Sequence, residues 1–445
     1  MNVKKYQSQS VLVATRDRIS KTFDSFEKIY VSFSGGKDSS VMMHLVLEEA
    51  IKRNRKVGIL IIDLEAQYAD TITHINKMVE YYKDHIDLHW ACLPMLLRNA
   101  VSNFQPRWVC WNPEKKDIWV REMPIQAKTE KDYPFYVPKM EFEEFMVLFG
   151  KWYSDYGKHL TAAFIGIRAD ESLHRYRAIA SNKQGLTHKD YKWTTKVAKN
   201  LFNIYPLYDW KTQDVWIYHG KYPNKYHNEI YDKMNMAGVK LSDQRLCQPY
   251  GDDQRKGLWL YHILEPETWY KLISRVNGAN SGAMYIREKG NMTGYNKITK
   301  PDNHTWKSFC HLLLRTMPKK TREHYTHRFK KFISSWNDRG YKKIPDEAPP
   351  ELEAKCWSPS WRRLCKVILR NDYWCKGLGQ TQPKSEAYIK YKEIQKLKKE
   401  KGKMEKEKQE QPKKNEQLRN VTQPDNENKL LIGDDIKMEQ LCLKL

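Results

Sequence analysis

The stretch Ile29-Tyr-Val-Ser-Phe-Ser34-Gly35-Gly36-Lys37-Asp38-Ser39-Ser40 determines the fold that we expect for this chain of 445 residues. A β-prone run, Ile29–Phe33, leads directly into two glycines, and Asp38–Ala50 follows with the pattern of an amphipathic helix. Glycines let the backbone turn tightly and approach a ligand without a Cβ in the way. A strand, a glycine turn and a helix within a dozen residues predict a cradle for an anion at the helix start.

The side chains around these glycines suit a phosphate group. The hydroxyls of Ser34 and Ser39 can donate hydrogen bonds, and Lys37 adds a positive charge. Asp38 would repel a bare phosphate, so its presence predicts a divalent cation, Mg²⁺, between the two. The Walker form of phosphate loop needs four residues between its glycine and its Gly-Lys pair, and this stretch lacks them. A plain turn that connects strand to helix is the alternative.

The neighbouring segments alternate between helix and strand. Helical spacing covers Val11–Phe26 and Tyr68–Lys83, whereas Val57–Leu64 is a nearly continuous apolar run, as expected for a parallel strand covered on both faces. Further expected elements are a strand at His89–Leu93, a helix at Glu141–His159, a strand at Thr161–Ile167 and a helix from Thr212. This alternation predicts an α/β fold with a doubly wound, mostly parallel sheet.

Composition divides the chain into three parts. We expect an α/β domain over residues 1–235 with an irregular Pro- and Trp-rich insertion at 102–138, a mainly helical domain over 236–380, and a flexible Lys/Glu-rich tail over 381–445. Within the helical domain, Trp306–Met317 and Arg322–Trp336 are expected to be helices.

Charge and cysteine content limit the function classes. The chain has 78 Lys and Arg against 54 Asp and Glu, a net charge of +24, which favours polyanionic partners; we predict nucleic acid, in particular DNA. A solvated lysine-rich surface is the alternative. No apolar run approaches the roughly 18–20 residues of a membrane span, and no secretory signal is visible, so we expect a cytoplasmic protein. The eight cysteines form no Cys-x-x-Cys pair, which indicates reduced thiols.

Three motifs together point to a family. Ser34–Ser39 resembles the pyrophosphate-binding PP-loop of the adenine nucleotide α-hydrolase-like superfamily. Phe164–Arg175 is similar to the Gly-x-Arg-x-x-Glu-Ser…Arg segment of its phosphoadenosine phosphosulfate (PAPS) reductase branch. Tyr205–Trp216 is similar to that branch's Pro-(hydrophobic)-x-x-Trp-x-x-x-Asp-Val-Trp. The order of the three motifs makes the resemblance specific.

The resemblance implies an adenine-nucleotide site that holds ATP or a PAPS- or APS-like nucleotide, with Mg²⁺ near Asp38. The residues expected in catalysis are Lys37, Asp38, Arg168, Glu171 and Arg175. Those expected to bind the nucleotide are Ser34, Gly35, Gly36, Lys37, Asp38, Ser39, Gly166, Arg168 and Ser172, together with Asp63 and Glu65. The last two follow the strand at Val57–Ile62, and open α/β sheets bind ligands at the carboxyl ends of their strands. The expected reaction is attack at the α-phosphate, with pyrophosphate leaving.

The chain departs from the reductases in its cysteines. Those enzymes attack the sulfonyl group with the cysteine of a C-terminal Glu-Cys-Gly-(Ile/Leu)-His segment, which is missing here, so PAPS reduction is not expected. Cys442 near the end of the chain lacks the neighbours that activate a thiolate.

Two other segments, Leu241–Leu258 and Arg275–Gly282, resemble the specific domain of a bacterial and prophage subgroup. This subgroup includes the immunoglobulin-binding regulator A type of transcriptional co-activator, encoded beside a ParB-like partner. The candidate residues in this part are Arg245, Cys247, Asp252, Asp253 and Arg255. Two alternatives to an ATP-cleaving enzyme follow: a co-activator that binds a nucleotide without turnover, and a DNA sulfur-modification enzyme that depends on one of the cysteines, with Cys247 the first to test. We also expect a homo-oligomer.

Overall fold

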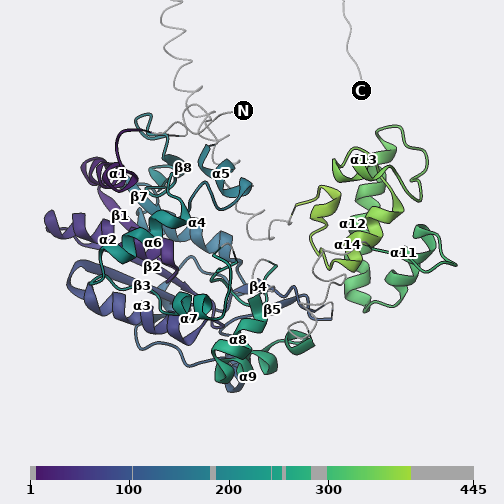
Figure 1. The fold of residues 1–445 in the computed structure, drawn as a ribbon, viewed down its shortest axis with the longest axis horizontal. Helices are drawn as coiled ribbons and strands as arrows, with labels where there is room; N and C mark the ends of the chain where they lie inside the picture. The colour runs from purple at the N-terminus through teal and green to yellow at the C-terminus, as the bar shows by residue number, and fades with distance from the viewer. Residues whose placement is uncertain are drawn as a thin grey trace, which may run out of the picture. The chain divides into compact units, whose positions relative to one another are not determined.

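A seven-stranded sheet forms the centre of the larger folded body (Figure 1). The computed structural model describes residues 7–102, 104–180, 187–241, 243–252, 257–281 and 298–381. The strands follow the order β6-β3-β2-β1-β7-β9-β8. Their bounds are β1 Lys28–Ser32, β2 Val57–Asp63, β3 Ile86–Cys92, β6 Ala127–Lys128, β7 Thr161–Ile165, β8 Thr194–Ala198 and β9 Leu201–Ile204. All neighbouring strands are parallel except β8 and β9. The expected mostly parallel α/β sheet is therefore confirmed.

The central strands are apolar because helices cover both of their faces. The helices of this body are α1 (Val11–Ser25), α2 (Lys37–Lys52), α3 (Ala69–Tyr81), α4 (Phe142–Tyr153), α5 (Leu173–Ala180), α6 (Thr212–Lys221), α7 (Ile230–Met236), α8 (Leu258–Leu264) and α9 (Pro266–Arg275). In register across three strands, Ile59, Val31 and Phe164 are fully buried. A strand that is buried on both faces has no polar alternation, which explains the continuous apolar run of β2.

The chain reverses direction across the sheet at β1. It runs from β1 through α2 to β2 and through α3 to β3, and then returns past α4 to β7 on the other side of β1. Right-handed crossovers place helices on opposite faces when the chain changes direction in this way. Accordingly, Tyr153 of α4 donates a hydrogen bond to the Ile29 carbonyl (3.2 Å) and packs against Gly58. The sheet is therefore doubly wound about a switch point at β1.

Several elements were not expected from the sequence. The hairpin of β8 and β9 extends the sheet, and α5 follows the loop after β7. The Pro- and Trp-rich insertion contains only short elements: β5 (Arg107–Val109), η2 (Pro113–Ile118), β6 and η3 (Glu130–Asp132), with β5 paired to β4 (Leu96–Arg98). Among the described residues, no helix has both the length and the apolar character of a membrane span.

A second hydrophobic core begins at Ile298. It is built around α11 (Trp306–Arg315), α12 (Lys319–Asn337) and α14 (Trp361–Leu369), with the short α13 (Pro350–Ala354) and η5 (Lys376–Leu378) beside them. Leu258 and Trp269 of α8 and α9 belong instead to the core of the sheet body. The predicted boundary at 235/236 stays a prediction, and the predicted tail lies outside the described residues, except for Thr381.

Candidate functional site

Two loops meet at the switch point of the sheet. Phe33–Gly36 connects β1 to α2, and Gly166–Ser172 connects the adjacent strand β7 to α5. Both loops leave the carboxyl ends of parallel strands at the point where the strand order reverses. Open α/β sheets bind their ligands in the crevice at this position. The topology alone thus marks the predicted phosphate cradle as the candidate site.

Glycine is required at two positions in these loops. Gly35 has a φ of +71°, and a Cβ there would lie 2.9 Å from Thr71 Cγ2 on α3. A Cβ on Gly166 would lie 3.1 Å from the Ser39 Cα, so that the end of β7 touches the backbone at the start of α2. Glycine permits both the left-handed conformation and the close approach. The sequence-predicted glycines therefore bring the two loops into contact.

Gly35→Ala is expected to destabilise the fold by about 2–4 kcal/mol, because backbone strain adds to the clash with Thr71. The matched control is Gly238→Ala: Gly238 has a φ of +72°, but its Cβ would meet no atom within 4 Å. This control is expected to cost about 1 kcal/mol from backbone strain alone. Chemical denaturation measures both free energies, and equal losses for the two variants would contradict the proposed packing of the loop.

The start of α2 leaves backbone amides available to an anion. The N-cap residue Gly36 provides no side-chain hydrogen bond to the helix. The Ser34 and Ser39 hydroxyls lie 3.0 Å apart, and the Ser39 hydroxyl also donates to the Gly36 carbonyl. The Lys37 amide donates to the Tyr231 hydroxyl on α7 (3.2 Å). An uncapped helix start of this kind carries partial positive charge that favours an anion.

The five residues predicted for catalysis form one chain of alternating charge. Lys37 Nζ lies 3.2 Å from Asp38 Oδ2, and Arg168 Nε donates to Asp38 Oδ1. Glu171 pairs with Arg168 (Nη2 to Oε1, 3.4 Å) and with Arg175, which lies four residues later, in α5. Arg168 is only 3% exposed, and Lys37 and Asp38 are buried, whereas Arg175 lies at the rim. Lys37 from the first motif and Arg168 from the second therefore contact the same carboxylate, that of Asp38.

Arg168 retains one unused donor at this site. Its Nη1 is buried and makes no hydrogen bond within the described part of the chain. The same holds for Nε1 of Trp216, whose ring lies 5.6 Å from the ring of Tyr231. A buried donor without an acceptor costs free energy, and a guanidinium donor most of all. These donors are therefore available to an acceptor outside the described residues.

Tyr231 and His219 were missed from the sequence. Tyr231 accepts from the Lys37 amide and lies under the Lys37 ammonium group, 5.3 Å from nitrogen to ring centre. Burial lowers the pKa of His219 to about 4, against smaller opposing effects from the backbone of Lys37 and the charge of Asp38. His219 lies three residues after the Asp-Val-Trp motif on α6, and this proximity to the motif could have identified it from the sequence. The motif residue Asp214 itself caps α6, as its Oδ2 accepts from the Lys211 amide (2.7 Å).

The buried histidines make stability dependent on pH. Burial lowers the pKa of His74 to about 3 and that of His219 to about 4, whereas an unfolded histidine titrates near 6.5. Their stabilisation is complete above pH 6.5 and is lost as the pH falls towards 4. At pH 5, each histidine is expected to lower the free energy of unfolding by roughly 2 kcal/mol relative to its value at pH 7.5. Thermal unfolding across this range tests it: His219→Asn should flatten the dependence on pH more than His159→Asn, whose side chain is 43% exposed. Equal curves for both variants would contradict the assignment.

The carboxylates of Asp63 and Glu65 accept hydrogen bonds from other segments of the protein. Asp63 at the end of β2 accepts from Trp90 Nε1 (2.8 Å), from Arg121 and from the Glu65 amide. Fully buried Glu65 accepts two hydrogen bonds from Arg275 on α9, at 2.6 and 2.9 Å. It also accepts from the backbone amides of Trp111 and Val120 in the insertion. All four carboxylate oxygens are thus occupied by protein donors, and nucleotide binding by these residues stays a prediction.

No hydrogen bond or ion pair found among the described residues joins Arg245 or Asp252 to these loops. Arg245 and Cys247 are exposed, and Asp252 lies 3.7 Å from Arg98 on β4. Asp253 and Arg255 fall outside the described residues. The Ser172 hydroxyl accepts from the Arg175 amide (3.2 Å), which places Ser172 at the start of α5.

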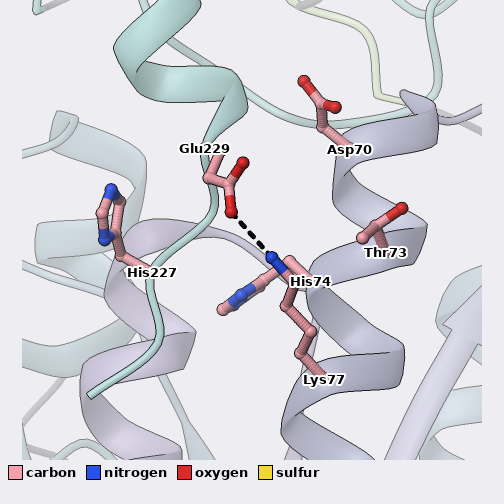
Figure 2. Close-up of a pocket in the computed structure, with 6 residues that line it drawn as sticks. All are labelled: Asp70, Thr73, His74, Lys77, His227 and Glu229. Carbon is pink, nitrogen blue, oxygen red and sulfur yellow. Dashed lines mark hydrogen bonds and ion pairs between the residues drawn. The ribbon is translucent and has the colours of Figure 1, made fainter. Parts of the chain in front are cut away.

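A small cavity lies beside α3 (Figure 2). Its volume is about 10 Å³, and it is lined by Asp70, Thr73, His74, Lys77, His227 and Glu229. The ion pair of Lys77 and Glu229 (2.7 Å) borders it, and the buried Nδ1 of His74 makes no hydrogen bond within the described residues. This volume fits one water molecule at most and excludes a nucleotide.

Comparisons with known proteins identify the family. The chain is 41% identical to the uncharacterized protein YbdN of Escherichia coli K12 over 395 residues, which cover 88% of this chain and 95% of YbdN. The chain belongs to the YbdN family. Residues 238–355 of the present chain match the model of a domain of unknown function, DUF3440. The uncharacterized protein MJ0066 of Methanocaldococcus jannaschii is 26% identical over 216 residues, 48% of this chain and 36% of its own length.

Solved structures show more distant likeness to this YbdN-family chain. The U34-tRNA thiolase NcsA from Methanococcus maripaludis is 15% identical, with a TM-score of 0.30, over 64% of this chain and 82% of NcsA. PAPS reductase from Candida auris, solved as a phosphate complex, is 12% identical, with a TM-score of 0.25, over 52% of this chain and 94% of that enzyme. The fold class of the YbdN-family chain rests on its strand order and helix placement.

Proposed function

We propose that this YbdN-family protein binds an adenine nucleotide on Ser34–Ser39 and cleaves the bond between its α- and β-phosphates. One observation carries the proposal: the buried Arg168, with an unused donor, lies beside the uncapped start of α2 at the switch point of the sheet. Each of these features favours an anion, and both loops belong to motifs that resemble those of PP-loop proteins. A triphosphate or a sulfonucleotide supplies the acceptors that the site lacks.

The chemistry assigned to the site is positioning and charge neutralisation. The amides at the start of α2 and the ammonium group of Lys37 hold the β- and γ-phosphates. The free edge of Arg168 faces the α-phosphate and neutralises the charge that develops there. A nucleophilic oxygen of the acceptor forms a bond to the α-phosphorus, and pyrophosphate leaves with the electron pair of the broken bond. No protein nucleophile is required.

The acceptor in this proposal is a nucleic acid. Support comes from the net charge of +24, which attracts a polyanion over long distances. Two experimental outcomes would favour a different function. A nucleotide that binds without turnover would favour the co-activator with a ParB-like partner. Sulfur incorporation into DNA that is lost in Cys247→Ser would favour sulfur modification.

Mg²⁺ does not fit the site as it stands. Both oxygens of Asp38 face cations, Lys37 and Arg168, and no three His, Cys, Asp or Glu converge on a metal position among the described residues. A metal ion at Asp38 therefore stays a prediction, and we assign no step of the reaction to it.

Pyrophosphate release from ATP tests the proposal. Release is expected to depend on DNA and to fall at least about 100-fold in Lys37→Ala and in Asp38→Asn. Lys37→Ala removes a preorganised positive charge, and Asp38→Asn removes the carboxylate that positions Lys37 and Arg168. Lys52→Ala, an exposed lysine on the same helix, is the matched control and is expected to keep full activity. Release that persists in both site variants, or that is absent with every adenine nucleotide, would overturn the proposed activity.

A further inference from the structure

The helical part of the chain contains two helices joined by a tight turn. α11 ends at Arg315, and α12 begins at Lys319 after only Thr316–Pro318. α14 packs against α11, and all three helices share one core. A turn of three residues joins the helices both of helix hairpins and of the helix-turn-helix, whose second helix lies in the major groove of DNA. α12 is the second helix here, and its 19 residues span about 28 Å.

α12 has one apolar face and one basic face. Its buried face packs Tyr325, Phe329 and Phe332 into the core. The exposed arc opposite consists of Lys319, Lys320, Glu323, His327, Lys330, Lys331 and Ser334. We call these seven residues the basic face. Its lysines lie in two pairs separated by about 16 Å along the helix axis, enough to reach phosphates on both sides of a major groove about 12 Å wide.

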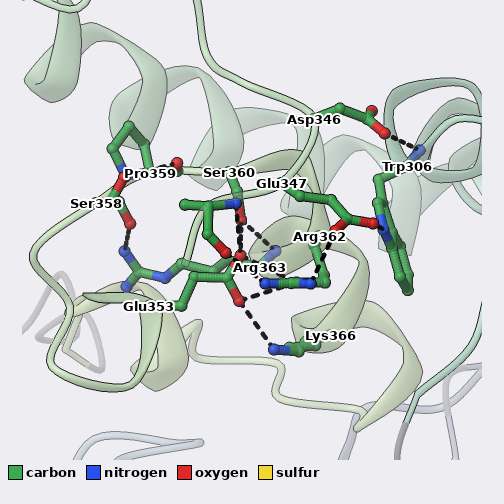
Figure 3. A network of polar contacts seen from close by, with 11 residues as sticks. Trp306, Asp346, Glu347, Glu353, Ser358, Pro359, Ser360, Arg362, Arg363 and Lys366 are labelled. Carbon is green, nitrogen blue, oxygen red and sulfur yellow. Dashed lines mark hydrogen bonds and ion pairs between the residues drawn. The ribbon is translucent and has the colours of Figure 1, made fainter. Parts of the chain in front are cut away.

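Basic residues outnumber acidic ones both in this part of the chain and on the basic face, where four lysines stand against Glu323. Residues 298–381 contain 18 Lys and Arg against 8 Asp and Glu. Figure 3 shows where several of the acids are used: Asp346 accepts from the Trp306 amide at the start of α11, and Glu353 pairs with Arg362 and Lys366. Within the described residues, no ion pair is found for any of the four lysines of the basic face. Their charge is therefore available to an external polyanion.

We propose that the basic face of α12 binds double-stranded DNA through its phosphates. This inference deepens the nucleic-acid link of the proposed function by naming the surface and the partner. Its own support is independent of the nucleotide site: the short turn between α11 and α12, the amphipathic α12, and four lysines for which the described residues provide no ion pair. Phosphate contacts from lysine give affinity that falls steeply with salt. A merely solvated helix face would show no such localised dependence.

The test is fluorescence anisotropy of a labelled 30-base-pair DNA with the full chain and no nucleotide, across a series of salt concentrations. Lys320→Gln/Lys330→Gln/Lys331→Gln is expected to weaken binding at least about tenfold at low salt. It is also expected to reduce the slope of log affinity against log salt by about 2–3. The matched control, Lys115→Gln/Lys192→Gln/Lys199→Gln, removes the same charge from exposed lysines of the sheet body.

The results separate the possible explanations. Circular dichroism melting first shows whether the Lys→Gln triple variant keeps the melting temperature of the parent. If the melting temperature falls, a triple Lys→Arg variant at the same positions, which preserves the charge, is used instead. It should retain the binding and the salt slope of the parent. Equal weakening by the control, unchanged binding by the α12 variant, or tighter binding of a duplex RNA of the same length would each overturn the proposal. Because no nucleotide is present, failure here leaves the pyrophosphate assay unaffected, and failure of that assay leaves this one unaffected.

Discussion

Arg168→Ala is expected to lower nucleotide-dependent pyrophosphate release by at least about 100-fold. The substitution removes the buried guanidinium that holds Asp38 and carries the unused Nη1 donor. Removing one preorganised donor from a developing negative charge costs about 2.7–4 kcal/mol of transition-state stabilisation. Arg168→Lys keeps the charge but loses the planar fork, and an intermediate loss is expected. Steady-state pyrophosphate release with saturating ATP and DNA measures both variants.

The control for this prediction lies on the helix that follows the loop. Arg177 of α5 is exposed, and Arg177→Ala is expected to retain the parent rate within about twofold. Because Arg168→Ala also leaves Asp38 less well paired, the melting temperature of each variant has to be measured beside its rate. A well-folded Arg168→Ala variant with the parent rate would show that this guanidinium does not serve the reaction.

Arg275→Ala is expected to destabilise the protein by about 3–5 kcal/mol. Arg275 and Glu65 form a doubly hydrogen-bonded pair in which both side chains are almost completely buried. Removal of one partner leaves an uncompensated buried charge. The same pair connects α9 to the end of β2, next to the site, so the loss is global rather than local. Equilibrium denaturation in urea gives the free energy of unfolding directly.

A partly exposed ion pair provides the comparison for Arg275→Ala. Arg16 and Glu48 lie 3.3 Å apart, and the Arg16 side chain is 42% exposed. Arg16→Ala is expected to cost at most about 1 kcal/mol, because solvent screens such pairs. The double variant Glu65→Ala/Arg275→Ala should recover part of the loss of the single variant. A cost for Arg275→Ala as small as that for Arg16→Ala would mean that the pair is not buried in solution.

The sequence predicts this fold best where its signals are local. The strand, glycine turn and helix of Ile29–Ala50 are contiguous, and the structure has β1 and α2 at nearly the same bounds. The hairpin of β8 and β9 was missed because Thr194–Ala198 is an edge strand with no apolar run. Its pairing to the sheet depends on contacts with β7, which lies more than 30 residues earlier.

The site was predictable to the extent that its residues lie in motifs. Lys37, Asp38 and Arg168 were named from two motifs 130 residues apart, and the structure joins them on one carboxylate. Tyr231 was missed because only the folded chain brings α7 to the Lys37 amide. Glu65 lies at the predicted sheet edge, but Arg275, the partner that occupies it, is 210 residues away, and no local pattern indicates such a pair.

The most direct test of the central claim is calorimetric titration of the protein with ATP. One saturable site per chain is expected, with affinity at least about tenfold weaker in Lys37→Ala and unchanged in Lys52→Ala. A well-folded protein that binds no adenine nucleotide, or binds one equally well after Lys37→Ala, would contradict the assignment of Ser34–Ser39 as a phosphate-binding loop.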